Sequence, residues 1–199
     1  MKSCFLLFFL VLSLTACGSK TVGVLSPPNS GPFALGGISG DYINACENEG
    51  DFSYQHVVSF QGNQMKLQSF TYLGESCDLN LLYGRHDRAL IYSDIKDSKD
   101  LPGYRDYSLT QEFFTATPAS VDAVMVYNQI SRYGYNDWQL NSPKDVAGRA
   151  STAGETPILP NGTHLINTIS NQGDEFQFAE YVNNKAVVST NPSSKFRRR

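Results

Sequence analysis

The stretch from Phe52 to Gln61 constrains the fold of this chain more than any other feature. Its side chains alternate between apolar and polar in steps of two, which is the period of a β-strand. Such a pattern is typical of an antiparallel sheet with one face turned to a core. The residues predicted to face inward are Phe52, Tyr54, His56, Val58 and Phe60. They are candidates to line a ligand cavity, although the same alternation fits a solid core.

Short segments bounded by turns continue along the chain and predict further antiparallel strands. Gly62-Asn63 separates the first strand from a second one that ends near Leu73, where a change in apolar parity predicts a bulge. The sequence contains 11 Tyr and 12 Phe, and aromatic residues favour strands. Other predicted strands are 77–83 and 89–93 around a charged turn at 84–88, 107–113 with Tyr107, Leu109, Gln111 and Phe113 on one face, 137–140, 163–170 and 175–181.

One helix is predicted at 119–133, because Thr117-Pro118 precedes it and Gly134 follows it. Together these elements predict a mainly β fold of antiparallel strands with one helix.

The N-terminus has a different character. An apolar run from Cys4 to Leu14 follows Lys2, as in a secretory signal peptide, and it is shorter than the about 20 residues that span a bilayer. Leu14-Thr15-Ala16-Cys17 resembles the lipobox of bacterial lipoproteins. The resemblance implies cleavage before Cys17, a diacylglycerol on its sulfur and a further acyl chain, such as palmitate, on its amino group. An ordinary secretory signal is the alternative.

The lipobox resemblance and the strand pattern together predict a domain organisation and a location. The predicted parts are a signal peptide (1–16), a lipidated N-terminus with a flexible tether (17–37), a β-rich domain (38–188) and a disordered basic tail (189–199). Two or three acyl chains would hold the protein on a membrane, since each buried CH₂ contributes about 0.8 kcal/mol. Gly18 follows Cys17 where Asp would suggest retention at the inner membrane, so the expected location is the cell envelope at the outer membrane.

Cysteine usage follows from the same resemblance. Of the four cysteines, Cys4 leaves with the signal and Cys17 carries lipid, so Cys46 and Cys77 remain. A pair in an oxidising compartment predicts one disulfide. The alternative is a metal site, but no histidines lie near this pair at ligand spacing.

The predicted domain resembles the lipocalin-like, or calycin-like, β-barrels of small secreted bacterial lipoproteins. The residues that carry the resemblance are Gly40-Asp-Tyr42 ahead of Ala45-Cys46, the strand to Phe60, the segment from Tyr72 to Cys77, and Tyr135-Asn-Asp-Trp138. Tyr42 stands where lipocalins have Trp. The resemblance implies an antiparallel small barrel or half-barrel that either holds a small apolar or amphipathic ligand or is filled by its own side chains.

Residues for catalysis are sparse. His56, His86 and His164 lie in different segments, and we interpret His56 as a core or cavity histidine and His86 as part of a solvated charged turn. No nucleophile elbow, zinc-protease motif or phosphate-binding glycine loop is present. The sequence therefore predicts no enzyme, no catalytic residue, no metal and no cofactor.

Charge argues against one class of partner. Removal of Lys2 with the signal leaves 15 of the 16 Lys and Arg residues against 19 Asp and Glu, so nucleic acid is not an expected partner. The expected function is a lipid-anchored, non-enzymatic binding protein for a small apolar or amphipathic ligand. The alternative is a structural or interaction protein of the cell envelope, whose partner would be another envelope protein.

Overall fold

A computed structural model describes residues 39–199 apart from 172–173 and 192–193. The predictions for the signal peptide, for lipidation at Cys17 and for the tether concern residues outside the described part of the chain. Within that part, no helix combines the length and the hydropathy needed to cross a membrane.

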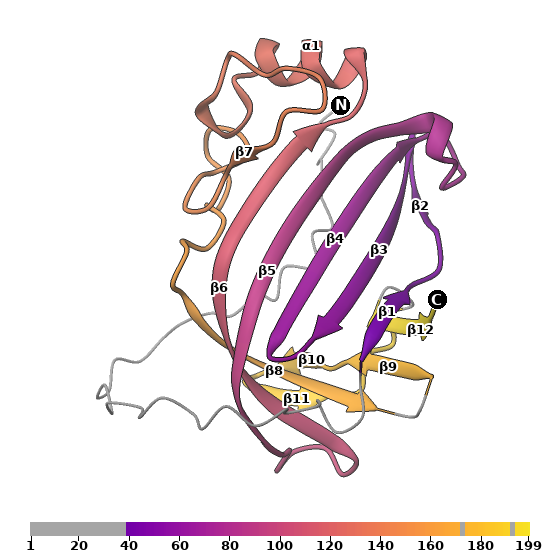
Figure 1. Ribbon diagram of the computed structural model, residues 1–199, viewed down its shortest axis with the longest axis vertical. Coiled ribbons are helices and arrows are strands. Elements are labelled where there is room, and N and C mark those ends of the chain that lie inside the picture. The colour runs from indigo at the N-terminus through magenta and orange to yellow at the C-terminus, as the bar shows by residue number, and fades with distance from the viewer. Residues whose placement is uncertain (1–38, 172–173, 192–193) are drawn as a thin grey trace.

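The described residues are mostly β-strand (Figure 1). The strands are β1 (Gly40–Ile43), β2 (Glu47–Glu49), β3 (Phe52–Gln61), β4 (Gln64–Leu73), β5 (Leu82–Asp97), β6 (Tyr104–Pro118), β7 (Lys144–Asp145), β8 (His164–Asn171), β9 (Glu175–Phe178), β10 (Glu180–Val182), β11 (Lys185–Val187) and β12 (Lys195–Arg198). The helices are α1 (Val121–Gln129) and the short 3₁₀ turns η1 (Leu79–Leu81) and η2 (Arg132–Gly134).

Eight of these strands close an antiparallel barrel. They follow the order β1-β12-β9-β8-β6-β5-β4-β3, and β3 pairs with β1 to complete the ring. β2 and β7 add short pairings to β3 and β6, and β10 and β11 form a separate hairpin. The predicted fold class is confirmed, because this is a small lipocalin-like barrel with one α-helix.

The ring is complete over only part of the length of its long strands. β1 pairs with residues 57–60 of β3, and β8 pairs with residues 104–110 of β6. We call this part the closed half. Beyond it, β3 to β6 continue as a curved sheet, next to α1 and the loop that leads to β8 (Figure 1). We call residues 119–163 the cap and the interior between it and the sheet the cap-side half.

Aromatic side chains fill the closed half. Phe176 and Phe196 stack with their ring centroids 4.7 Å apart, and Tyr42 meets Phe176 edge-on at 5.0 Å. The buried residues of this core are Tyr42, Val58, Phe60, Met65, Leu90, Tyr92, Tyr107, Leu109, Leu165, Ile169, Phe176, Phe178 and Phe196. Every strand of the ring contributes at least one of them, so this core ties the barrel together.

A second core joins the cap to the sheet. Tyr127 of α1 meets Tyr83 of β5 and Trp138 of the cap loop, both edge-on, at centroid distances of 6.2 and 5.3 Å. Ser120 caps α1, because its side chain accepts a hydrogen bond from the backbone N–H of Ala123. The helix spans Val121–Gln129 and is therefore shorter than the predicted 119–133.

The predicted charged turn at 84–88 is wrong. β5 runs without interruption from Leu82 to Asp97, and its pairing with β4 and β6 continues through Arg85, His86 and Asp87. Charged residues persist in this strand because they alternate between its two faces. On the outer face, Arg85 donates to Asp87 at 2.7 Å, so the charges there neutralise each other.

Two further predictions need correction. Phe113 does not share a face with Leu109 and Gln111, because the register of β5 and β6 shifts between Ala89 and Leu90 and turns Phe114 inward instead. The segment 137–140 is not a strand, since its residues form part of the cap loop.

The predicted disordered tail is also wrong. Residues 195–198 form β12, which pairs with both β1 and β9. Phe196 points into the barrel and is buried, while Lys195 and Arg197 are exposed. The sequence of β12 resembles a solvated tail because it has a single apolar residue between cations. The core that buries Phe196 is built by strands distant in the sequence, so the local pattern does not indicate it.

The predicted disulfide is confirmed. Cys46 and Cys77 are bonded, and their Cα atoms lie 5.8 Å apart. The bond links the residue before β2 to the segment after β4. It lies at the end of the sheet that belongs to the cap-side half.

Candidate functional site

The five residues predicted to face inward do so, but they divide between the two halves of the barrel. Val58 and Phe60 are buried in the aromatic core of the closed half. Phe52, Tyr54 and His56 lie toward the cap and remain partly exposed. The inner face of β3 thus changes from solid core to solvent-accessible surface along its length.

The neighbouring strand β4 shows the same change. Met65 pairs with Phe60 and is buried, whereas Ser69 and Thr71 pair with His56 and Tyr54 and are partly exposed. On both strands, inward side chains are therefore buried toward the closed half and partly exposed in the cap-side half.

Polar side chains form a row across this accessible interior. The pairing places His56, Ser69 and His86 beside one another on β3, β4 and β5. Nδ1 of His56 lies 2.9 Å from the hydroxyl oxygen of Ser69, and Nε2 of His86 lies 3.0 Å from the hydroxyl oxygen of Tyr133. Desolvation lowers the pKa of His56 to about 4 and that of His86 to about 3, so both rings are neutral at pH 7.

The next inward position on β5 is Arg88. It pairs with Leu67 of β4 and Phe114 of β6, both of which pack inside the barrel, and its side chain is only 8% exposed. Its Nε donates to Oε1 of Gln111 at 2.7 Å, and the Gln111 amide donates to the backbone oxygen of Leu159 at 2.6 Å. Burial lowers the pKa of Arg88 to about 10, which leaves the guanidinium charged at neutral pH.

The cap brings a second cation to this interior. Arg132 lies over two tyrosine rings. Its guanidinium carbon is 4.6 Å from the ring centroid of Tyr127 and 5.5 Å from the ring centroid of Tyr133. Its Nε is buried without a hydrogen-bond partner. Ser131 and Tyr133 on either side adopt positive φ angles of 49° and 56°, which non-glycine residues seldom adopt. Backbone conformations of this kind are strained, and they persist only where the surrounding contacts hold them in place.

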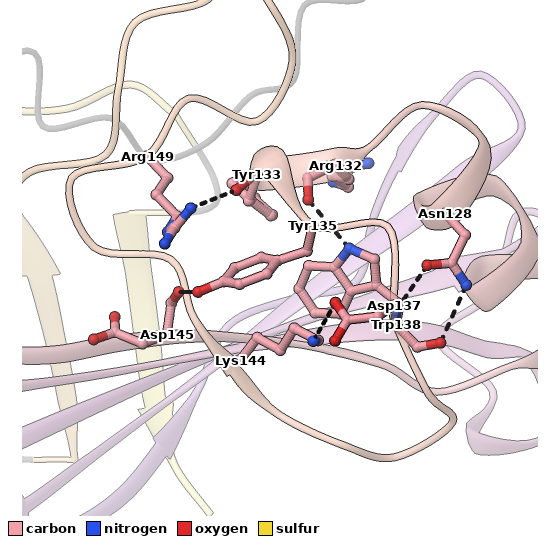
Figure 2. A network of polar contacts seen from close by, with 9 residues as sticks. All are labelled: Asn128, Arg132, Tyr133, Tyr135, Asp137, Trp138, Lys144, Asp145 and Arg149. Carbon is pink, nitrogen blue, oxygen red and sulfur yellow. Dashed lines mark hydrogen bonds and ion pairs between the residues drawn. The ribbon is translucent and has the colours of Figure 1, made fainter.

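Those contacts are visible in Figure 2. The Trp138 indole donates to the backbone oxygen of Arg132 at 3.1 Å, and the Asn128 side chain bonds both the backbone N–H and the backbone oxygen of Trp138. Arg149 donates to the backbone oxygen of Tyr133 at 3.4 Å. Hydrogen bonds from three separate parts of the cap therefore fix the turn that carries Arg132.

Gly84 lets the cap approach the sheet closely. A Cβ atom at this position would lie 2.9 Å from the hydroxyl oxygen of Tyr127, closer than such contacts allow. We expect Gly84→Ala to lower the free energy of unfolding by about 1–3 kcal/mol in urea titrations, because overpacking displaces the Tyr127 ring. Tyr127→Phe removes the clashing oxygen, so the double variant should recover much of the loss. A double variant whose losses simply add would contradict this contact.

Burial of His86 predicts a dependence of stability on pH. Its folded pKa of about 3 lies below the ordinary value of 6.5, so the unfolded chain binds the proton first as the pH falls. We expect the contribution of His86 to stability to be complete above pH 6.5 and to fall by about 1.4 kcal/mol per pH unit below it, or about 2 kcal/mol at pH 5, and the depressed pKa of His56 to add a similar loss.

Urea titrations at pH 7.5 and 5.0 test this dependence. The variant His86→Gln should lose about 2 kcal/mol less than the wild type between the two pH values. His164→Gln is the matched control, because His164 is exposed on the outside of the barrel. Equal acid sensitivity of His86→Gln and the wild type would contradict the burial of a neutral ring.

Sequence reasoning missed three important residues of this site. His86 and Arg88 fall within the predicted turn at 84–88. The alternation of His86, Arg88, Leu90 and Tyr92 has the period of a strand and is the signal that identifies them as inward-facing strand residues. Arg132 had no such signal, since its position depends on the fold of the cap.

Comparison with known proteins adds no relative. No model of a protein family matches the sequence, and no curated protein matches it either. Among the residues that the structure describes, no three His, Cys, Asp or Glu side chains gather as metal ligands would. The class of protein that the fold defines is a small, closed antiparallel β-barrel with a single α-helix.

Proposed function

We propose that this protein is a lipid-anchored lipoprotein of the bacterial cell envelope that binds a small amphipathic molecule in the cap-side half of its barrel. The observation that carries the binding proposal is the gradient of exposure along β3 and β4. Inward side chains that remain accessible to solvent, such as Tyr54 and Thr71, indicate space beside them.

The chemistry of that space suits an amphipathic ligand. Phe52 and Leu73 supply apolar surface near the cap, and both pack against the second core. The row of His56, Ser69 and His86 supplies polar groups deeper inside. Ligand sites commonly combine mostly apolar walls with a few polar groups that orient the molecule.

The anchor is the other half of the proposal. The lipobox at residues 14–17 supports it, and the confirmed disulfide fits export to an oxidising compartment. Envelope fractions should contain the wild type, while Cys17→Ser should appear in the soluble fraction or remain unprocessed. A mass of the N-terminal peptide without acyl chains would contradict the anchor.

Native mass spectrometry of the full mature chain tests the binding proposal. The protein is extracted from envelopes in mild detergent and compared before and after denaturation. A small amphipathic molecule released on denaturation is the expected result. A protein that carries nothing but detergent, and from which no small molecule is released, would contradict the binding function.

A second function is favoured by one specific observation. Val121 and Met125 on α1 are 63% and 58% exposed, and Ile130 after the helix is 43% exposed. Such an apolar surface on the cap fits docking to another envelope protein. A photocrosslinker at Met125 should then give a discrete adduct in intact cells, whereas one at the exposed Val182 of β10 should not.

A further inference from the structure

Arg88 is a buried cation without a counter-charge. Among the described residues, no carboxylate forms an ion pair or hydrogen bond with it, and its polar contact is the neutral amide of Gln111 at 2.7 Å. An unpaired charge in a protein interior costs several kcal/mol, and buried charges are therefore normally paired. Arg88 is nevertheless buried in the barrel and charged at neutral pH.

The wall around Arg88 offers no acid either. Its neighbours in the same row are Val58, Leu67 and Phe114. The nearest acid along the chain, Asp87, points to the outer face, where Arg85, Lys66 and Gln68 bind its carboxylate.

The cap adds positive charge on the opposite side of the same space. Arg132 is held between tyrosine rings, with a buried Nε that has no hydrogen-bond partner. The charges of Glu49 and Arg132 both act on Tyr54, and those of Arg132 and Asp87 both act on His86, whose side chains face the same interior. Glu49 is exposed to solvent, and Asp87 is paired with Arg85 and Lys66 on the outer face. The two buried guanidinium groups are therefore less screened and less neutralised than these acids, which favours an anion inside.

We infer that the ligand carries an anionic group, a carboxylate, sulfate or phosphate ester, which pairs with the Arg88 guanidinium inside the barrel. This inference rests on the proposed binding function and names the chemistry of its ligand. An arginine fork matches such groups with two parallel hydrogen bonds. The polar row beside Arg88 and the aromatic residues toward the cap then contact the rest of the molecule.

A matched pair of probes tests the inference on the full mature chain. cis-Parinaric acid carries a carboxylate, and its methyl ester has the same chain without the charge. We expect the wild type to bind the acid at least tenfold more tightly than the ester. Arg88→Met should weaken binding of the acid at least tenfold and change that of the ester less than twofold.

Two further variants act as controls. Arg85→Met removes a cation from the outer face of the same strand and should leave both affinities unchanged. Arg88→Lys keeps the charge and should retain the preference for the acid. The urea midpoint of Arg88→Met without probe should change little, because removal of an unpaired buried charge offsets the loss of the hydrogen bond to Gln111. A large fall in this midpoint would identify Arg88 as a structural residue and overturn the inference.

The binding results separate two kinds of failure. Equal affinities for the acid and the ester, unchanged in Arg88→Met, would overturn the inference that the ligand is anionic. The proposed binding function would then still stand. Binding of neither probe would overturn the proposed function and with it the inference.

Discussion

Replacement of Phe196 by Ala should lower the free energy of unfolding by about 3–5 kcal/mol. The ring is 1% exposed, stacks on Phe176 at 4.7 Å and meets Phe178 edge-on at 5.5 Å. Its removal leaves a cavity in the core to which every strand of the ring contributes. It also weakens β12, the strand that joins β1 to β9. Urea unfolding followed by circular dichroism measures the loss.

The adjacent residue provides a matched control. Arg197 lies on the same strand but is exposed, and its ion pair with Glu175 at 2.8 Å is open to solvent. Exposed ion pairs contribute about 0–1 kcal/mol, so Arg197→Ala should change stability little. Similar losses for Phe196→Ala and Arg197→Ala would contradict the placement of β12 in the barrel.

Loss of the disulfide should have the next largest effect. In the chain-entropy model, a bond between cysteines 31 residues apart stabilises a fold by about 3–4 kcal/mol. The double variant Cys46→Ser/Cys77→Ser should lose this amount in urea titrations under oxidising conditions.

Reduction provides the internal control for this second prediction. Dithiothreitol should lower the stability of the wild type to that of the double variant and leave the double variant unchanged. A loss below about 1 kcal/mol in the double variant would show that the bond contributes little to stability.

The features predicted correctly are those that depend on residues close together in the sequence or on a single residue type. The alternation of Phe52 to Phe60 identified β3 and its inward face, and cysteine arithmetic identified Cys46–Cys77. The first feature is visible within one segment, and the second follows from counting the cysteines. Neither requires knowledge of the neighbouring strands.

The errors arose where neighbours decide the structure. The segment 84–88 resembles a turn because Gly84 and four charged or polar residues stand together, but β4 and β6 hold it in the sheet. The bulge that turns Phe114 inward depends on the register with β5. The role of Phe196 depends on a core assembled from strands more than 100 residues away, such as β1 at Tyr42.

The candidate site was predictable only in part. Phe52, Tyr54 and His56 lie on the same face of β3 as Val58 and Phe60 and are partly exposed, so a role as ligand lining stays a prediction for them. Val58 and Phe60 belong to the solid core instead, because the short strands close the ring around them. The distinction between lining and core depends on where β1 and β8 end, which the sequence of β3 does not reveal.

A variant that fills the cap-side half tests the central claim most directly. Thr71 faces this interior and is partly exposed, whereas its neighbour Phe70 faces outward. Native mass spectrometry should show the bound small molecule in the wild type and in Phe70→Trp but not in Thr71→Trp, with all three proteins folded. Retention of the molecule by Thr71→Trp would contradict a ligand site between the sheet and the cap.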